Sequence, residues 1–402
     1  MECTSVRTAP AMLTPVTAGS LLAAFAAVTD PRRRASITYS LAALLALALT
    51  AILANQCSVL AIAEWAARQG SAVLAPLGFS PGHTPCQSTL HRLFAKLDST
   101  SLSAALQAAF APAVAADPTA RGAQAVAIDG KAQRGRLPFQ VGGCPVHALS
   151  AFCHDAGVVL AQEPIDPGQA AEKSEAELTV APMLLDRIDW RGRILTGDAR
   201  FCQRGICQRV LDAGGDYLLV VKENQPTLYQ DLQLLFDPPY PVPPLSDRRE
   251  ARTREHGHGR QHETRHLIAS TDLNGYLDWP GVAQAFRLER TWQAGGVQKR
   301  AVHYGIVSLP PSIADARRLL AVRRGHWSIE NQLHYPKDVS MDEDRSLVHT
   351  GQGPTVLAML RDSALSLIRL AGWRTIASRL RAFTDNPTAA VALVTQSVPA
   401  RA

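Results

Sequence analysis

The order of strands and helices between residues 124 and 221 most limits how this chain of 402 residues can fold. Short apolar, β-branched runs predict strands, and longer stretches with helical periodicity lie between them. The predicted strands cover 124–129, 146–153, 157–163, 193–196 and 217–221, and the predicted helices cover 172–185 and 202–213. The turn at 154–157 makes the second and third strands a hairpin. This order predicts an α/β domain with a mixed sheet flanked by helices.

The residues before this region carry helical patterns. Residues 40–54 (SLAALLALALTAILA) are apolar, but they fall short of the roughly 20 residues that a membrane span needs. We therefore expect a buried core helix, with a membrane-associated protein as the less favoured alternative. A further helix at 89–97 places Leu90, Leu93, Phe94 and Leu97 on one face. Together these patterns predict a helical domain over residues 10–115.

The pattern changes again after residue 222. Strand-like runs at 264–270, 285–292 and 301–309 predict a β-rich segment at about 222–312. Its stretch 247–266 holds six arginines and four histidines, for which contact with DNA phosphates, a solvated loop and a histidine metal site are all open. A helix is predicted over 313–335, ended by Pro336, and one or two amphipathic helices over 355–383.

Composition narrows the class of protein. The formal net charge of +6 and the pI of about 9.0 permit a nucleic-acid partner without establishing one. The seven cysteines are scattered and form no C-x-x-C pair, which argues against a disulfide framework or a zinc ribbon. No basic start leads into an apolar run, so we expect no signal peptide. The predicted location is the cytoplasm, in association with the nucleoid.

Three carboxylates stand out by their positions. Asp129 ends the first predicted strand, Asp198 follows the fourth, and Glu330 lies within the predicted helix 313–335. Phosphodiester cleavage needs an activated water or hydroxyl and a stabilised leaving oxygen, which two Mg²⁺ ions can provide. Such hard cations prefer oxygen ligands. Each acid alone could be a turn residue, a helix cap or part of a surface ion pair, but this order of the three predicts a metal site.

Several motifs resemble one family. The strand order is that of the RNase H-like fold, and the residues around the acids resemble insertion-sequence DDE transposases of the H-repeat-associated branch. The helical start resembles that branch's DDE-associated N-terminal domain. The motifs are VAIDGKAQRGR (126–136), ILTGDARFCQR (194–204), YLLVVKENQPTL (217–228), RRGHWSIENQLHYPKDVSMDEDRS (323–346), DPRRR (30–34) and TPCQSTLHRLFAKLD (84–98). Motifs in this order over about residues 18–375 are more specific than any one pattern.

The resemblance implies a function and a domain plan. Asp129, Asp198 and Glu330 would be the catalytic residues and would bind two Mg²⁺ or Mn²⁺ ions. The catalytic core would span 120–375, interrupted by the β-rich insertion at 222–312, with a C-terminal tail at 376–402. The enzyme would cut at the terminal inverted repeats of the transposon and join the ends to target DNA, without a membrane and as a homo-oligomer on DNA.

The sequence also departs from the family. The wider family often has Tyr, Arg and Lys around the glutamate. Here Lys337 is at the Lys position, His326 at the Arg position and Arg323 at the Tyr position. In the segment 172–178, Glu175 stands where the branch usually has Asn. None of these changes affects the three acids.

Basic and polar residues near the acids are the candidate DNA contacts. Residues 323, 326, 330, 334 and 337 recur at helical spacing and could share one face, although a solvated helix with ordinary ion pairs is the alternative. The helix at 89–97 could read base edges in the major groove. The alternative is that its polar residues lie on the surface of a domain used only for dimerisation. The predicted DNA-binding residues are Lys131, Arg134, Arg200, Lys222, Asn224, Gln225, Arg323, His326, Lys337 and Arg92.

The preferred function is therefore a DDE transposase. Two alternatives of related origin are a transposase-derived DNA-binding protein without activity and a non-transposing nuclease of RNase H-like fold. Loss of one acid would favour the first, and all three acids are present. A strand-transfer assay would separate the second.

Overall fold

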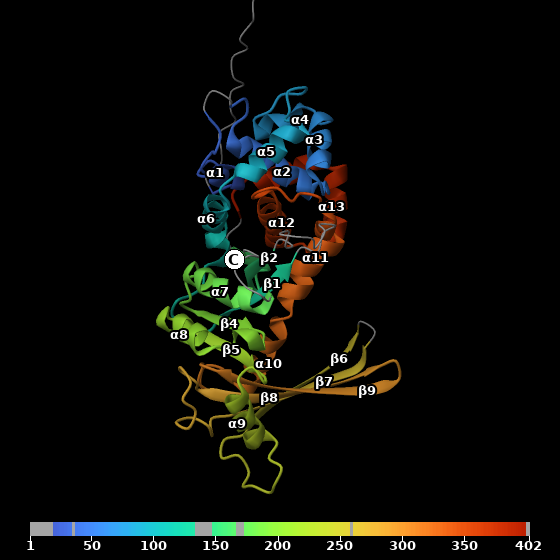
Figure 1. Ribbon diagram of the computed structural model, residues 1–402. Helices are drawn as coiled ribbons and strands as arrows, with labels where there is room; N and C mark the ends of the chain where they lie inside the picture. Colours follow the sequence, from blue (N-terminus) through green and yellow to red (C-terminus); the bar gives the residue numbers. More distant parts are fainter. Residues whose placement is uncertain (1–18, 34–36, 133–146, 166–172, 258–259, 399–402) are drawn as a thin grey trace, which may run out of the picture. The chain divides into compact units, whose positions relative to one another are not determined.

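The computed structural model describes residues 19–33, 37–132, 147–165, 173–257 and 260–398, which form two compact units (Figure 1). The helical unit contains residues up to Val114 and from Leu333 onward. The sheet unit contains Ala115–Ala132 and His147–Gln332. The middle of the chain therefore makes one unit, and its two ends make the other.

The sheet unit is built on nine strands in the order β3-β2-β1-β4-β5-β9-β8-β7-β6. β1 pairs in parallel with β4, and β4 with β5, whereas the other neighbours are antiparallel. The strands are β1 (Gln124–Ala132), β2 (His147–Cys153), β3 (Val158–Ile165), β4 (Arg193–Gly197), β5 (Asp216–Val221), β6 (Arg249–Gly257), β7 (Arg260–Ser270), β8 (Gln284–Ala294) and β9 (Val297–Val307). The predicted mixed sheet and the order of its first five strands are confirmed.

Helices cover both faces of this sheet, as predicted. On β5, Leu218 belongs to a buried cluster with Leu319 and Leu320 of α10, whereas the next residue back, Tyr217, lies beside Cys207 of α8. Since successive residues of a strand point to opposite faces, α8 and α10 lie on opposite sides of the sheet. The helices of this unit are α7 (Lys173–Asp186), α8 (Arg204–Asp212), α9 (Pro226–Phe236) and α10 (Ala316–Gly325).

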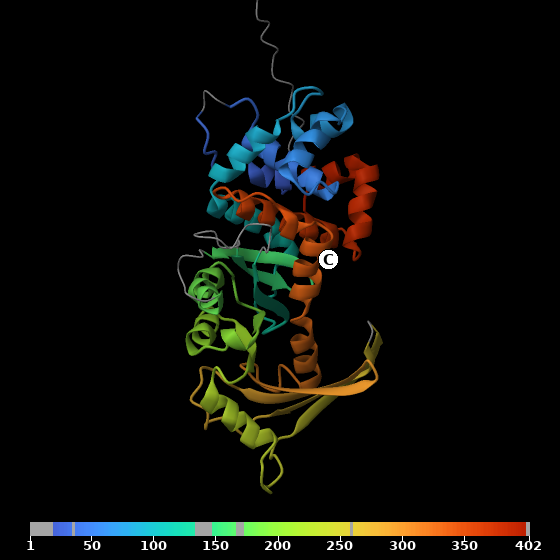
Figure 2. The same ribbon diagram turned by 45° about the vertical axis from the view of Figure 1, so that its right-hand side comes forward.

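The insertion extends the central sheet. β9 pairs with β5, and β8, β7 and β6 follow it outward. α10 packs on one face of these strands, where Leu267 and Leu288 are buried, and α9 packs on the other through a contact of Tyr229 with Tyr304 (Figure 2). The inserted segment therefore shares one continuous hydrogen-bonded sheet with the predicted catalytic strands.

The structure corrects the prediction for residues 247–266. Most of this stretch forms the hairpin of β6 and β7, so the solvated-loop alternative is wrong. Three strands were predicted in the insertion, and four are present. β6 was missed because arginines and glutamates alternate with small residues along it. Among the side chains of this edge strand that the structure describes, Ala251 alone packs against the buried cluster, so the sequence of the strand carries little apolar signal.

The helical unit is organised around two buried helices. In α2 (Leu41–Leu53) every residue except Ala42 is buried, and in α12 (Gly353–Leu370) nearly every residue is buried. α12 packs on α2, α5 and α6. The predicted core helix at 40–54 is thus confirmed, and no helix among the described residues is long and apolar enough to cross a membrane. The other helices before Val114 are α1 (Leu21–Phe25), α3 (Val59–Ala67), α4 (Ser71–Leu74), α5 (Gln87–Lys96) and α6 (Ser99–Phe110).

The C-terminal segment lies in this helical unit, a grouping that differs from two predicted boundaries. The core was expected to run to 375, with a tail at 376–402. Instead α12, α13 (Ile376–Asp385) and α14 (Pro387–Thr395) pack with the N-terminal helices. An 18-residue helix that is buried on nearly all sides needs partners around it, and the sequence alone does not show which segment supplies them.

Pro336 does not end the helix that carries Glu330. Residues Glu330–His334 form a π-helical turn, and α11 (Tyr335–Val339) continues directly from it. A proline ring normally collides with the carbonyl four residues back. The wider π turn removes the usual four-residue bonding pattern just before this proline, and the chain continues as a helix through Lys337.

Lys337 is buried within the helical unit, so its predicted contact with DNA phosphates is not retained. Its ammonium lies 2.8 Å from Asp362 and 3.5 Å from Glu343, and its side chain is 3% exposed. Arg361 also approaches Glu343 at 3.4 Å. Burial lowers the pKa of Lys337, but the two carboxylates outweigh burial and raise it. The lysine therefore stabilises a buried charge network.

We predict that Lys337→Met destabilises the protein by about 3–5 kcal/mol, because it leaves buried carboxylates without their cation. The free energy of unfolding is measured by urea denaturation, with Lys96→Ala on the exposed side of α5 as the control. An unchanged free energy of unfolding combined with weaker DNA binding would instead support the phosphate contact.

Candidate functional site

The pairing of β1 with β4 places two of the three acids side by side. These strands run parallel, with Ala127 opposite Thr196. Two residues further along lie Asp129, within β1, and Asp198, directly after β4, so the same register brings them to one level on adjacent strands. The first strand was predicted to end at Asp129, but β1 continues to Ala132 because it stays paired with β2 over these residues. Asp129 is half-buried, and the side chain of Asp198 is 40% exposed.

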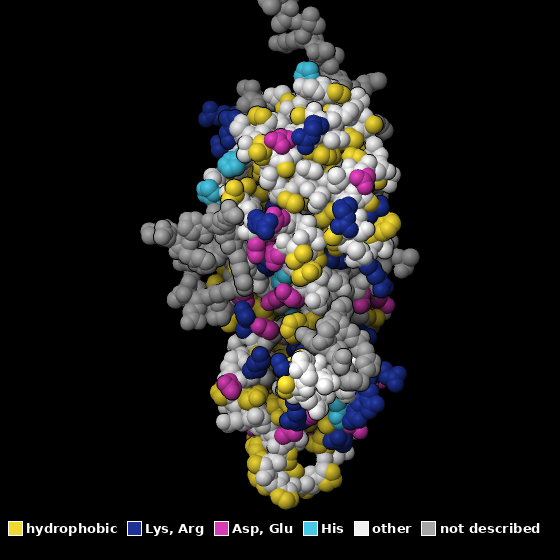
Figure 3. Space-filling view, turned by 90° about the vertical axis from the view of Figure 1, so that its right-hand side faces the viewer, with side chains coloured by type: hydrophobic (Ala, Val, Ile, Leu, Met, Phe, Trp, Pro, Cys, Tyr) yellow, Lys and Arg dark blue, Asp and Glu magenta, His cyan; other side chains and the backbone are white. Residues whose placement is uncertain are grey.

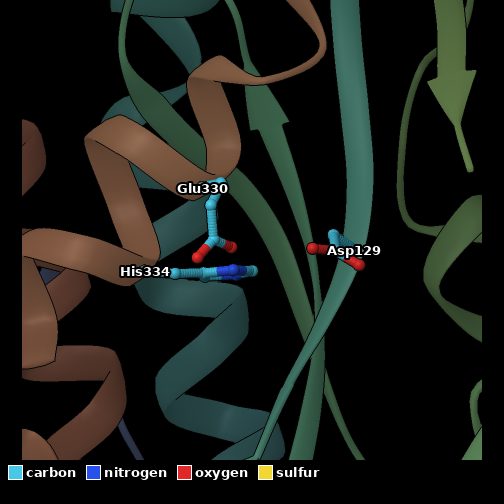
Figure 4. Close-up of side chains that lie close together, drawn as sticks. All are labelled: Asp129, Glu330 and His334. Carbon is cyan, nitrogen blue, oxygen red and sulfur yellow. The ribbon is translucent and has the colours of Figure 1, made fainter. Parts of the chain in front are cut away.

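Glu330 approaches Asp129 from the other side. It begins the π-helical turn after α10, and its carboxylate lies on the side of β1 to which Asp129 points (Figure 4). A carboxylate oxygen of Glu330 lies within 4.8 Å of one of Asp129. His334 is four residues further along the same π turn. A residue after α10 and a residue on β1 are thus brought together across 201 positions of the chain.

Asp198 is held by Arg200. The backbone N–H of Arg200 donates to Asp198 Oδ1 at 3.1 Å, and its Nε donates to Oδ2 at 2.9 Å. The same guanidinium pairs with Glu177, which is fully buried on α7. Burial lowers the pKa of Arg200, but Asp198 and Glu177 outweigh it and raise the pKa. Arg200 was predicted to contact DNA, and here it binds two carboxylates. The sequence prediction missed Glu177.

The acids present a donor set that fits hard divalent cations. Carboxylate oxygens are the ligands that Mg²⁺ and Mn²⁺ prefer. The separation of the Asp129 and Glu330 oxygens is within the span of ligands around one ion or a close pair of ions. Asp198 is not a member of this compact group among the described residues, because its carboxylate is turned toward Arg200.

His326 is buried in a row of hydrogen-bonded polar side chains near the acids. Its Nδ1 is hydrogen-bonded to the Thr196 hydroxyl at 3.2 Å, and His154 Nε2 is bonded to the same hydroxyl at 3.0 Å. Gly325 is required beside this row, since a Cβ there would lie 2.6 Å from His154 Nδ1. The prediction that His326 contacts DNA is therefore not retained, and His154 and Thr196 were missed.

Both histidines are neutral in the folded protein. Burial lowers the pKa of His326 to about 3, with Arg323 and His154 adding to the effect, and burial lowers that of His154 to about 4. Neutral imidazoles can each exchange one hydrogen bond with the Thr196 hydroxyl. These hydrogen bonds link His326, four residues before Glu330, to Thr196 on β4, the strand that precedes Asp198.

Arg323 differs from the other arginines near the acids. Its side chain is 9% exposed, yet Nε and Nη1 have no hydrogen-bond partner among the described residues. Burial lowers its pKa to about 10, an effect that the charge of Asp198 opposes. Arg323 lines a cavity of about 760 Å³ that also reaches Glu330. A buried, largely unsatisfied guanidinium favours an anion at this place.

A second cavity of about 540 Å³ opens at Asp198 and includes the exposed Lys222. Asn224 donates to the Ala199 carbonyl at 2.7 Å, and Gln225 donates to that of Cys202 at 3.0 Å. These two amides therefore tie the loop after β5 to the loop after β4, and Lys222 exposes its charge at this cavity.

The other predicted contacts are dispersed. Lys131 is half-buried near the end of β1, and Arg92 is exposed on α5 in the helical unit, where its Nε donates to the Ser88 carbonyl at 3.0 Å. Arg134 and the side chain of Glu175 lie outside the described residues.

Comparison with known proteins identifies the family. The model of the "Transposase DDE domain" matches residues 97–367, and a model described as "DDE_Tnp_1-associated" matches residues 22–109. The chain belongs to the DDE transposase family. The two matches cover both the helical start and the strands that carry the acids, so the resemblance stated from the motifs is confirmed.

Individual relatives agree with this assignment. This transposase-family chain is 32% identical over 255 residues to the candidate transposase YncI of Escherichia coli O157:H7, covering 61% of each chain. It is 28% identical over 253 residues to the H repeat-associated candidate transposase YhhI of Escherichia coli (strain K12), covering 60% of this chain and 63% of that one. The match thus spans about three-fifths of the length of these relatives.

Among solved structures, a piggyBac transposase synaptic complex with hairpin DNA aligns over 92% of this chain and 78% of the other. The sequence identity is 10% and the TM-score is 0.39.

We predict that the two buried histidines make the transposase-family protein sensitive to acid. Their folded pKa values lie below the unfolded value of about 6.5, so the unfolded state gains protons first as the pH falls. Stability should be complete above about pH 6.5 and fall by about 2 kcal/mol per histidine by about pH 5. Urea denaturation at several pH values measures this, and His326→Gln should flatten the dependence. His349→Gln, at an exposed histidine, should leave it unchanged.

Proposed function

We propose that this protein cuts DNA at the ends of an insertion sequence and joins them to target DNA, using two Mg²⁺ or Mn²⁺ ions. The observation that carries the proposal is the meeting of Glu330 with Asp129, beside Asp198 in the register of β1 and β4. Membership of the transposase family supports the same reaction.

The proposed reaction has two phosphoryl-transfer steps. Water attacks the phosphodiester at the transposon end and releases a 3′-hydroxyl, and this hydroxyl then attacks a phosphodiester of the target. Ions bound by Asp129, Asp198 and Glu330 would lower the pKa of the attacking group and stabilise the leaving oxygen. No covalent bond between enzyme and DNA is needed.

The residues around the acids take separate roles in this proposal. Arg323 would bind a phosphate oxygen next to the acids, because its guanidinium is buried and two of its nitrogens have no partner within the described ranges. Lys222 and Lys131 would contact phosphates on either side of the three acids. Arg134, which lies outside the described residues, stays a predicted phosphate contact. Arg200 would hold Asp198 in place until the ions bind. Two transposon ends must be brought together, so we propose a homo-oligomer on DNA.

We predict that Glu330→Gln abolishes cleavage and keeps both the fold and DNA binding. Glutamine preserves the shape of the side chain but lacks the charge that retains a divalent ion. Cleavage of labelled transposon ends with Mg²⁺ is measured beside thermal unfolding, and Glu64→Gln, at an exposed glutamate of α3, is the matched control. Cleavage at the wild-type rate would reject the role of Glu330. Cleavage without strand transfer by the wild type would identify a nuclease.

Helix α5 is the proposed reader of the transposon ends. A site that handles phosphates carries little sequence information, so other residues must read base edges. α5 buries Leu90, Leu93 and Phe94 in the helical unit and leaves Arg92 exposed. Because α12 packs on α5, the isolated residues 1–115 would lack part of its support, and the full chain is the proper test.

We predict that Arg92→Ala in the full chain reduces the preference for terminal-repeat DNA over scrambled DNA. Loss of one base-edge contact should cost about 1–3 kcal/mol of discrimination. Affinities for both DNAs are measured at one stated salt concentration, with Arg68→Ala, at the exposed C-cap of α3, as the control. An unchanged preference would move recognition away from α5.

A further inference from the structure

The cavity beside Glu330 is lined by charges from the insertion. Along β8, Leu288 packs in the buried cluster with α10, and the next residue on the same face is Arg290. Arg265 of β7 lies directly opposite Arg290 in the sheet. The cavity thus begins where the apolar contact with α10 ends, and its floor is an arginine-bearing surface of the sheet.

Two glutamates hold these arginines in a continuous ladder of ion pairs. Glu263 pairs with Arg290 and, at 2.8 Å, with Arg265. Glu255 pairs with Arg265 at 3.0 Å and with Arg324 of α10. The ladder therefore runs from β8 through β7 and β6 to the helix that leads to Glu330. Basic and acidic side chains also lie next to one another over the insertion strands on the surface (Figure 3).

The ladder holds three guanidinium groups in place around the cavity. Arg290 also lies over the ring of Trp292, with its guanidinium carbon 4.5 Å from the ring centroid. This stacking constrains Arg290 independently of Glu263. Three arginines against two glutamates leave the ladder with a net positive charge.

An independent observation points to an anionic ligand. Arg323 lines the same cavity, is nine-tenths buried, and has two guanidinium nitrogens without a partner in the described part of the chain. The glutamates of the ladder are bonded to other arginines. A phosphate oxygen in the cavity could accept hydrogen bonds from these two Arg323 nitrogens.

We propose that this cavity binds the phosphodiester backbone of a DNA strand, and that Glu255 and Glu263 occupy the arginines in place of phosphates until DNA arrives. The inference rests on the proposed function, because it assumes a DNA substrate at Glu330. Entry of the strand exchanges carboxylate partners for phosphate partners on Arg265, Arg290 and Arg324. The glutamates therefore weaken DNA binding and keep other anions away from the acids.

The proposal predicts that removing a glutamate charge strengthens DNA binding. Glu263→Gln should bind end DNA about tenfold more tightly at low salt, since no carboxylate competes with phosphate or repels it. The slope of log affinity against log salt should become steeper by about 1, because one more phosphate is neutralised. Arg290→Ala should change both quantities in the opposite direction. Fluorescence anisotropy with the full chain over a salt series measures them.

Matched variants keep the test decisive. Glu250→Gln removes a glutamate of the same hairpin that alternates to the other face of β6, and it should leave the affinity unchanged. Glu255 is more exposed than Glu263, so its substitution disturbs the fold less. If Glu263→Gln does not fold, Glu255→Gln replaces it in the same binding measurement. Thermal unfolding identifies folded variants.

The outcomes separate this proposal from the proposed function. Unchanged or weaker binding by the folded glutamate variants overturns the ladder as a stand-in for phosphates, and it would assign the glutamates a purely structural role. If the wild type also fails to bind and cut end DNA, the proposed function is overturned with it. If the wild type cuts normally, only the ladder proposal is lost.

Discussion

The parallel pairing of β1 with β4 is the constraint on which the candidate site depends. The alignment of Ala127 with Thr196 fixes the register of the residues that follow, so that Asp129 and Asp198 lie opposite each other. A slip of one residue would turn one of them to the opposite face of the sheet. The apolar residues Ala125 and Ile194 of the same strands lie in the cluster with α10, so the packing that holds this register also anchors the helix that leads to Glu330.

Most of the charge near the acids serves the protein itself. Arg200 binds Asp198 and the buried Glu177, and Lys337 binds two carboxylates in the helical unit. His326 is neutral and bonded to Thr196. A buried charge is costly without a partner, and Arg200 and Lys337 are each paired with carboxylates of the same protein. Arg323 stands apart because two of its buried guanidinium nitrogens have no hydrogen-bond partner among the residues that the structure describes, which makes its position the strongest indication of an anion beside the acids.

The insertion extends the central sheet and adds a charged surface next to the acids. Since β9 continues the sheet from β5, a rigid surface extends from the strands that carry the aspartates to the edge strand β6. Its apolar part supports α10, and its charged part lines the cavity that reaches Glu330. Side chains on a continuous sheet keep their spacing better than side chains on a loop, which suits a surface that aligns a repeating phosphate backbone. The same sheet therefore supports the acids that we propose as catalytic and positions the arginines that we assign to DNA.

The five-strand order and the buried helix α2 could be predicted from the sequence, because apolar periodicity and motif order are local properties of the chain. The sequence also singled out the three acids, whose catalytic role stays a prediction. It did not reveal β6, whose alternating charges hide an edge strand, or the C-terminal helices as partners of the N-terminal ones. It also could not tell a buried lysine from a DNA-binding one at Lys337. Burial and ion pairing are decided by residues distant in sequence, such as Asp362 for Lys337 and Glu177 for Arg200, so only the tertiary structure could assign them.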